Sequence, residues 1–142
     1  MQRCLPDEHH HHRGKHAVIR NPHSGLVLDA GDDQVKLQHF TGFAAQLWSV
    51  EPTDEGKFFI RNKANGKVLD IQGGSKRGHN IITFEKHGGE NQQWHLNSDD
   101  TIVNVCDNLA LDIYKDRYHA GNHLVAWTKH GKPNQHFYFQ YQ

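Results

Sequence analysis

Residues 109–139 read LALDIYKDRYHAGNHLVAWTKHGKPNQHFYF, and the parts of this stretch recur twice upstream. Its opening apolar run ends in Asp112, as KVLD ends in Asp70 and LVLD ends in Asp29. A glutamine followed two residues later by an aromatic residue comes after each of these runs, as Gln46 with Trp48, Gln92 with Trp94, and Gln135 with Phe137. The chain is therefore built from one pattern used three times.

The spacing of these elements is nearly constant along the chain. The three aspartates follow one another at almost equal intervals, and the three glutamines do the same. Units of this size need their fellows to bury an apolar face, so they are expected to pack together as one body. We expect a tail over 1–15 and a single domain over 16–142, with repeats of about 42 residues at roughly 16–56, 57–99 and 100–142.

Short apolar runs separated by turn residues predict strands rather than helices. Residues 17–21 and 59–62 alternate in polarity, and each is followed by a polar turn and a second apolar run, which is typical of hairpins. We expect about four strands in each repeat, an all-β fold, and an apolar interior shared by the three units. The side chains expected to point inward are Leu28, Leu69, Leu111, Trp48, Trp94 and Phe137.

Three degenerate repeats that carry Gln-x-Trp, Gln-x-Trp and Gln-x-Phe resemble the ricin B-type (R-type) lectins, and most of all the galactose-binding tandem-repeat lectins of earthworms. The resemblance covers residues 16–142. It implies a β-trefoil with pseudo-threefold symmetry, in which the glutamine and the aromatic residue of each motif are largely structural.

The resemblance also implies a sugar site in repeat three. A carboxylate can accept hydrogen bonds from two neighbouring hydroxyls, and an amide can both donate and accept. An aromatic ring can cover the apolar face of galactose. The residues that fall where the family places these groups are Asp112, Trp127, His130 and Asn134, with Gln135 orienting the aspartate or the loop.

Repeat two keeps most of this set. Its glutamine is preceded by Phe84 at the same offset at which Trp127 precedes Gln135, and a phenyl ring offers less area than an indole. We therefore expect a weaker site made of Asp70, Phe84, His87, Asn91 and Gln92.

Repeat one departs from the pattern and is expected to be a degenerate site. It retains Asp29 and Gln46, but Gln38 stands in place of the ring and Ala45 in place of the asparagine. Its segment from aspartate to glutamine, 29–46, is shorter than the segments 70–92 and 112–135 of the other repeats. His39 is the one feature that leaves binding there open.

These features predict a lectin for terminal galactose or N-acetylgalactosamine, with galactose-containing glycans, glycoproteins or glycolipids as partners. Two sites on one body would be multivalent, able to cross-link glycans and agglutinate cells. Protonation of His87 and His130 could make binding depend on pH. We expect a monomer or a weak homodimer, with no cofactor and no bound metal.

Two other classes of function compete with this interpretation. A glycosidase needs two carboxylates about 5 to 10 Å apart across one bond. Here the motif aspartate recurs once in each repeat, and the three should lie far apart around the threefold axis, so an enzyme is not expected. The chain could still resemble the carbohydrate-binding module of a larger enzyme. With 14 histidines it could also be a His-rich trefoil of the actin- and membrane-binding type.

Composition narrows the remaining classes. Sixteen Lys and Arg balance 16 Asp and Glu among 142 residues, which argues against nucleic acid as a partner. No apolar run approaches the roughly 18 residues of a spanning helix, and the first residues lack the apolar stretch of a signal peptide. Membrane insertion is therefore not expected, and the chain could be cytoplasmic or secreted by a non-signal route. The tract His9 to His12 could bind a transition metal through its imidazoles. We interpret it as part of a solvated tail and assign no function to it.

Overall fold

A computed structural model describes residues 15–142, so the histidine tract and the rest of the expected tail up to residue 14 lie outside the described part. The described residues hold twelve strands in three groups of four. The first group is β1 (Ala17–Arg20), β2 (Val27–Asp29), β3 (Lys36–Gln38) and β4 (Trp48–Pro52). The second is β5 (Phe58–Asn62), β6 (Val68–Ile71), β7 (Ile81–Phe84) and β8 (Trp94–Leu96), and the third is β9 (Ile102–Asn104), β10 (Leu109–Ile113), β11 (Leu124–Thr128) and β12 (Tyr138–Tyr141).

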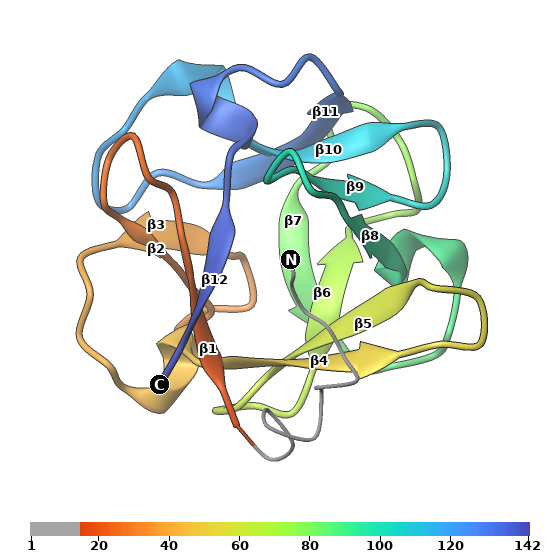
Figure 1. Ribbon diagram of the computed structural model, residues 1–142, viewed down its shortest axis with the longest axis horizontal. Helices are drawn as coiled ribbons and strands as arrows, with labels where there is room; N and C mark the ends of the chain where they lie inside the picture. Colours follow the sequence, from red (N-terminus) through yellow and green to blue (C-terminus); the bar gives the residue numbers. More distant parts are fainter. Residues whose placement is uncertain (1–14) are drawn as a thin grey trace.

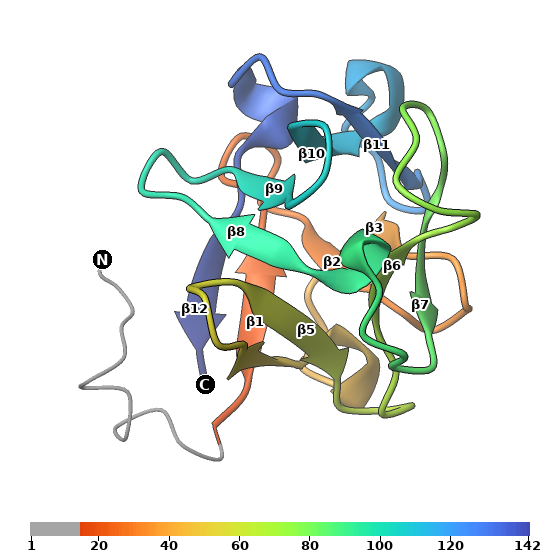
Figure 2. The ribbon, with the colours of Figure 1, turned by 90° about the vertical axis from the view of Figure 1, so that its right-hand side faces the viewer.

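Strand pairing closes the three groups into a ring. The last strand of each group pairs antiparallel with the first strand of the next, as β4 with β5, β8 with β9, and β12 with β1. The first and last strands of the chain therefore lie side by side (Figures 1 and 2). The two middle strands of each group form a hairpin, as β2 with β3, β6 with β7, and β10 with β11. This is the β-trefoil expected from the repeats, seen in Figure 1 as three units around one axis.

The three hairpins bind one another through a cyclic set of backbone hydrogen bonds. Thr83 N donates to Asp33 O at 2.8 Å, and Ala126 N donates to His79 O at 2.9 Å. The ring is completed by Leu37 N, which donates to Asn122 O at 2.8 Å. Each hairpin thus has a loop of the neighbouring repeat along its outer strand.

The expected core is confirmed. Leu28, Leu69 and Leu111 are fully buried, as are the three aromatic residues of the Gln-x-aromatic motifs. The indole N–H groups of Trp48 and Trp94 donate to the carbonyl oxygens of Leu28 and Leu69 at 3.3 and 3.2 Å. Phe137 occupies the third position and has no such donor.

Three buried asparagines tie each repeat to the one before it. Between each third and fourth strand lies a one-turn 3-10 helix, η2 (Ala44–Gln46), η3 (Glu90–Gln92) or η5 (Pro133–Gln135). Asn62 Nδ2 donates to Ala45 O in η2, and Asn104 Nδ2 donates to Glu90 O in η3, both at 2.9 Å. Asn21 Nδ2 donates to Pro133 O in η5 at 3.0 Å, so the cycle includes the two ends of the chain.

The shortening of repeat one lies wholly in its hairpin loop. Leu37, Thr83 and Ala126 hold equivalent places, and each precedes the glutamine of its repeat by the same number of residues. The stretch from the aspartate to this place is 29–37 in repeat one, which is shorter than 70–83 in repeat two and 112–126 in repeat three. No helix within residues 15–142 is both long and apolar enough to cross a membrane.

Because Trp94 is buried in the core, its replacement should lower the stability of the fold. Trp94→Phe removes a buried hydrogen bond and leaves a void, so we expect the free energy of unfolding to fall by about 1 to 3 kcal/mol. Trp127→Phe makes the same chemical change at an exposed ring, and we expect less than about 0.5 kcal/mol there. Guanidinium unfolding followed by far-ultraviolet circular dichroism measures both, and equal losses for the two variants would contradict the assignment of Trp94 to the core.

Candidate functional site

A buried glutamine supports the candidate site in each repeat. In repeat three, Gln135 Nε2 donates to Asp112 Oδ2 at 2.8 Å and to Thr128 O at 3.1 Å. Its Oε1 accepts the backbone N–H groups of His130 and Gly131 at 2.9 and 3.1 Å. The side chain is fully buried, so Gln135 holds the aspartate and the loop in place and has no group left for a ligand.

The same arrangement recurs in the other two repeats. Gln92 Nε2 donates to Asp70 Oδ2 at 2.8 Å and to Glu85 O at 2.9 Å. Gln46 Nε2 donates to Asp29 Oδ2 and to His39 O, both at 2.9 Å. Gln92 and Gln46 are fully buried as well, so all three glutamines support the sites from below.

An asparagine completes the set in repeats two and three. Asn134 Nδ2 donates to Asp112 Oδ1 and to Ile113 O, both at 3.2 Å. Asn91 Nδ2 donates to Asp70 Oδ1 at 3.2 Å and to Ile71 O at 3.0 Å. Within residues 15–142 no hydrogen bond reaches the Oδ1 atom of either asparagine, so each presents an acceptor next to the carboxylate.

The two aspartates are nearly buried, with 3% of Asp70 and 4% of Asp112 exposed. Burial disfavours the ionised form and raises the pKa of Asp112 to about 6, against the opposing hydrogen bond from Gln135 and with a small contribution from the negative charge of Asp116. Burial also raises the pKa of Asp70, where Gln92, His87 and Asn91 oppose the shift. Each carboxylate is therefore a poorly solvated acceptor, which favours ligands that donate hydrogen bonds to it.

A histidine stands over each of these carboxylates. The backbone N–H of Lys132 donates to His130 Nδ1, and that of Gly89 donates to His87 Nδ1, both at 3.0 Å. In the neutral ring the proton must then be on Nε2, which lies 3.6 Å from Asp112 Oδ2 in repeat three and 3.8 Å from Asp70 Oδ2 in repeat two. Burial and the positive charge of Lys132 lower the pKa of His130. This ring therefore stays neutral to a lower pH than an ordinary histidine does.

The aromatic ring of each site lies on the same face of its hairpin as the aspartate. Asp112 pairs with Val125 and Asp70 with Ile82, so Trp127 and Phe84, two residues further on, project to that face. Both rings are exposed, to 42% and 49%. They are free to take the apolar face of a ligand.

A loop of repeat two contacts the Trp127 ring of repeat three. Strand β11 has β10 on one edge and residues Gly78 and His79 of repeat two on the other, bound through Ala126. From this loop the Arg77 guanidinium lies 5.2 Å from the centroid of the Trp127 ring. Asp112 on β10 and Arg77 in the loop therefore lie on opposite edges of β11. The contact between Arg77 and Trp127 was not predicted from the sequence.

In repeat two these groups surround a hollow of about 310 Å³. The lining contains four of the predicted residues and four that were not predicted, namely Asp70, Phe84, His87 and Asn91 with Gln72, Gly73, Gly74 and Ile82. The glycine-rich segment after Asp70 was not among the predicted site residues. Its position directly after the aspartate in a hairpin was the one signal that it could form a wall of the site.

Repeat one lacks most of the groups that surround the carboxylate in the other two repeats. Gly31 N donates to Asp29 Oδ1 at 2.7 Å, because the short loop turns back at once, and Gln46 occupies Oδ2. The position of His87 and His130, five residues before the glutamine, is taken by Thr41, whose Oγ1 accepts Phe43 N at 3.1 Å. His39 instead corresponds to Glu85 and Thr128, whose backbone carbonyls serve the glutamines. Asp29 therefore lacks the histidine, the asparagine and the aromatic ring that surround Asp70 and Asp112.

The chain belongs to the family described as ricin-type beta-trefoil lectin domain-like, whose family model matches residues 8–84 and 44–127. It resembles the designed threefold-symmetric protein ThreeFoil, with 24% identity and a TM-score of 0.82 over 89% of this chain and 98% of that one. It also resembles the C-half of the earthworm R-type lectin, solved in complex with GalNAc, with 27% identity and a TM-score of 0.74 over 90% of this chain and 99% of that one.

A third similar structure is 1,3Gal43A, an exo-beta-1,3-galactanase from Clostridium thermocellum. The identity is 25% and the TM-score 0.81, over 89% of this chain but only 30% of the galactanase. Among curated proteins, none matches this chain. Family and fold together make this a lectin-type, carbohydrate-binding domain.

From the raised pKa of Asp112 we expect sugar binding in repeat three to depend on pH. A ligand that donates to the carboxylate binds only the ionised form, so affinity falls as the pH drops through about 6. In an Asp70→Asn background, which silences repeat two, we expect lactose to bind about tenfold more weakly at about pH 5 than at about pH 7. Calorimetric titration measures this.

Two variants separate Asp112 from the histidine above it. His130→Gln leaves the buried carboxylate in place, so the midpoint of the pH profile should stay near its original value. Asp112→Asn cannot titrate, so whatever affinity it keeps should not vary over this range. A profile that is flat in the parent would contradict the prediction for Asp112. A pH dependence that vanishes only with His130→Gln would assign it to the histidine.

Proposed function

We propose that this protein is a lectin that binds terminal galactose or N-acetylgalactosamine through the sites in repeats two and three. The observation that carries the proposal is that one arrangement is built twice. In each repeat an aspartate is held by a buried glutamine and an asparagine, beneath an exposed ring and a histidine Nε2–H. Repeat one, which lacks the ring and the asparagine, serves as an internal contrast.

The groups of each site fit the chemistry of galactose. The carboxylate accepts from two neighbouring hydroxyls, the free Oδ1 of the asparagine accepts another, and the histidine Nε2–H can donate. The apolar C–H face that an axial 4-hydroxyl leaves on galactose can lie on Trp127 or Phe84. The earthworm lectin half that this chain resembles was solved with GalNAc bound, which supports the same class of sugar here.

The two sites are expected to differ in strength. Trp127 offers a larger ring than Phe84, and the Arg77 guanidinium lies 5.2 Å from the centroid of this ring. Repeat three should therefore hold a single galactose more tightly than repeat two. Both rings are exposed, so each site should be weak on its own.

Two weak sites on one rigid body suit cross-linking. Engagement of both on one glycosylated surface can raise the apparent affinity by roughly 10² to 10⁴ when the geometry permits. Binding one glycan on each of two particles links them, so agglutination follows from the same arrangement.

A second candidate function is that of a carbohydrate-binding module within a larger enzyme. The observation that favours it is the likeness to part of a galactanase, of which this chain covers 30%. Both functions need the same two sites, and they differ in whether the domain cross-links by itself.

Single-site variants test the proposal. Asp112→Asn and Asp70→Asn each remove the charge that accepts sugar hydroxyls, and loss of charged hydrogen bonds of about 1.5 to 3 kcal/mol should weaken that site at least tenfold. Agglutination of galactose-bearing erythrocytes needs both sites, so we expect either variant to abolish it while one site still binds lactose. Gln38→Ala, in repeat one, is the matched control and should agglutinate normally.

The identity of the sugar is tested by NMR titration of the parent chain. Galactose, lactose and N-acetylgalactosamine should shift the indole signal of Trp127 and the side-chain amide of Asn134, with smaller shifts at Asn91. Glucose and mannose should not, and the buried indole of Trp94 should stay still. Agglutination that persists in high lactose, or silence for every sugar with the fold intact, would refute the proposal.

A further inference from the structure

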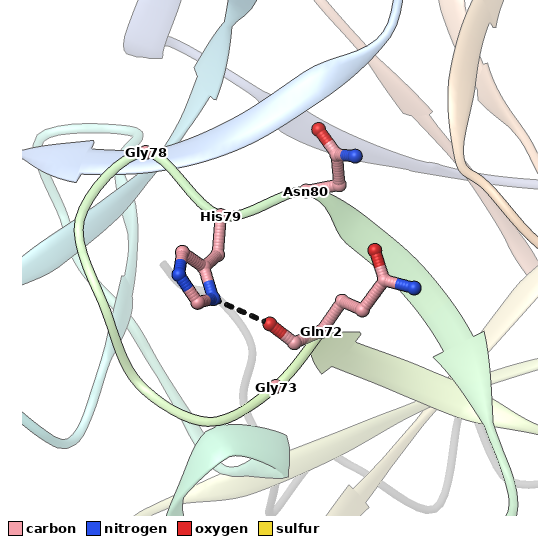
Figure 3. A pocket seen from close by; sticks show the side chains of 5 residues that line it. All are labelled: Gln72, Gly73, Gly78, His79 and Asn80. Carbon is pink, nitrogen blue, oxygen red and sulfur yellow. Dashed lines mark hydrogen bonds between the residues drawn. The ribbon is translucent and has the colours of Figure 1, made fainter.

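A second hollow, of about 370 Å³, lies at the tip of the hairpin formed by β6 and β7. Figure 3 shows the five residues that line it, Gln72, Gly73, Gly78, His79 and Asn80. Two of them, Gln72 and Gly73, also line the hollow of about 310 Å³ that contains Asp70 and Phe84, which is the hollow beneath Phe84. The two hollows therefore adjoin, and each is near the small end of the range of about 300 to 1,000 Å³ that ligand sites occupy.

The hairpin register places both hollows on one face. Asp70 pairs with Ile82, and two residues further on Gln72 N donates to Asn80 O at 2.9 Å. Side chains two residues apart on a paired strand project to the same side, and Figure 3 shows the amides of Gln72 and Asn80 doing so. The row of polar groups that starts at Asp70 thus continues to the tip of the hairpin.

The second hollow is lined by hydrogen-bonding side chains, two amides and an imidazole. Neither Gln72 nor Asn80 makes a side-chain hydrogen bond within residues 15–142, so both amides can donate and accept. His79 Nδ1 lies 2.7 Å from Gln72 O, and because a carbonyl only accepts, Nδ1 carries a proton. In the neutral ring Nε2 is then an acceptor. Gly73 has a φ of +79° and a Cβ there would lie 3.2 Å from His79 Nδ1, so the loop needs glycine to seat this ring.

This lining suits sugar hydroxyls better than other ligands. It contains no acidic, Lys or Arg side chain to hold an ion, and no Phe, Tyr or Trp ring on which a galactose could stack as it would on Phe84. It could therefore bind a sugar only through the hydroxyl groups of that sugar. The adjoining site around Asp70 and Phe84 would hold the sugar unit linked to it.

We propose that this hollow is a subsite for a second sugar residue, glycosidically linked to the galactose over Asp70, so that repeat two recognises a disaccharide. The inference rests on the function proposed above and extends it. Repeat two would then recognise a disaccharide, whereas repeat three would recognise a single galactose.

The other repeats lack this subsite for physical reasons. In repeat three the counterparts of Gln72 and Asn80 are Tyr114 and His123, joined by the equivalent backbone bond. Their rings stack on each other with centroids 4.3 Å apart, so they cover the place that two free amides leave open. In repeat one the loop is too short to form it, since only the segment 30–36 separates Asp29 from the place equivalent to Thr83.

The test compares one sugar with two in a chain where only repeat two binds. In an Asp112→Asn background, calorimetry with methyl β-galactoside, lactose and β1,3-galactobiose should show at least one disaccharide binding about fivefold or more tightly than the monosaccharide. Asn80→Ala in that background should weaken this disaccharide about three- to tenfold, the effect of one neutral hydrogen bond. It should leave methyl β-galactoside unchanged, because Asn80 does not line the hollow beneath Phe84.

Controls come from the other repeats. Gln38→Ala removes an amide of similar size from repeat one and should change neither ligand. In an Asp70→Asn background, where only repeat three binds, Asn80→Ala should have no effect on any of the three sugars. As a readout that needs no substitution at the subsite, the side-chain amide signals of Asn80 should shift with the disaccharide and not with the monosaccharide.

The outcomes separate the two proposals. Equal affinity for the monosaccharide and both disaccharides, with unmoved Asn80 signals, would overturn the subsite and leave the lectin function standing. A loss of monosaccharide binding in Asn80→Ala equal to that of the disaccharide would also overturn it. Failure of every galactoside to bind either background would refute the proposed function, and the subsite with it.

Discussion

The hydrogen bond from a buried glutamine to an aspartate, made once in each repeat, is the interaction on which the rest of the structure depends. Gln46, Gln92 and Gln135 each donate to an aspartate at the end of a hairpin strand and accept two backbone N–H groups from the following loop. A buried amide left unpaired costs about 1 to 3 kcal/mol, so this connection is strongly specified. Two residues on, the chain enters the core through an aromatic side chain. One short motif therefore joins the carboxylate of the site to the centre of the fold.

No repeat is complete without its neighbours. The 3-10 turn that carries Asn91 is held by Asn104 of repeat three, and the turn that carries Asn134 is held by Asn21 of repeat one. Because each turn is held by a neighbouring repeat, repeat one keeps the hydrogen bond between Asp29 and Gln46 although it has neither the ring nor the asparagine. Its aspartate accepts hydrogen bonds from Gln46 and from the backbone of Gly31, so it holds the loop in place whether or not a ligand binds there.

Much of the candidate site could be predicted because one distance is constant. From the hairpin position of Leu37, Thr83 and Ala126 to the glutamine, the number of residues is the same in every repeat, so offsets counted back from the glutamine place Trp127 and Phe84 correctly on the sheet. The same counting places Thr41 where the other repeats have histidine, whereas His39, the residue that left binding in repeat one open, lies elsewhere. What could not be predicted lies in the loops of unequal length, where Gln72, Gly73 and Gly74 have no register with the other repeats.

The sequence by itself determined the threefold β architecture, the core and the identity of the groups beneath each ring, because period and alternation are local properties that repeat. Only the tertiary structure decided how repeats meet. It brings Arg77 against Trp127 across a repeat boundary, and it leaves the amides of Gln72 and Asn80 open where Tyr114 and His123 close on each other. Such contacts depend on how hairpins from different repeats pack around the axis, and the spacing of residues along one chain does not carry that information.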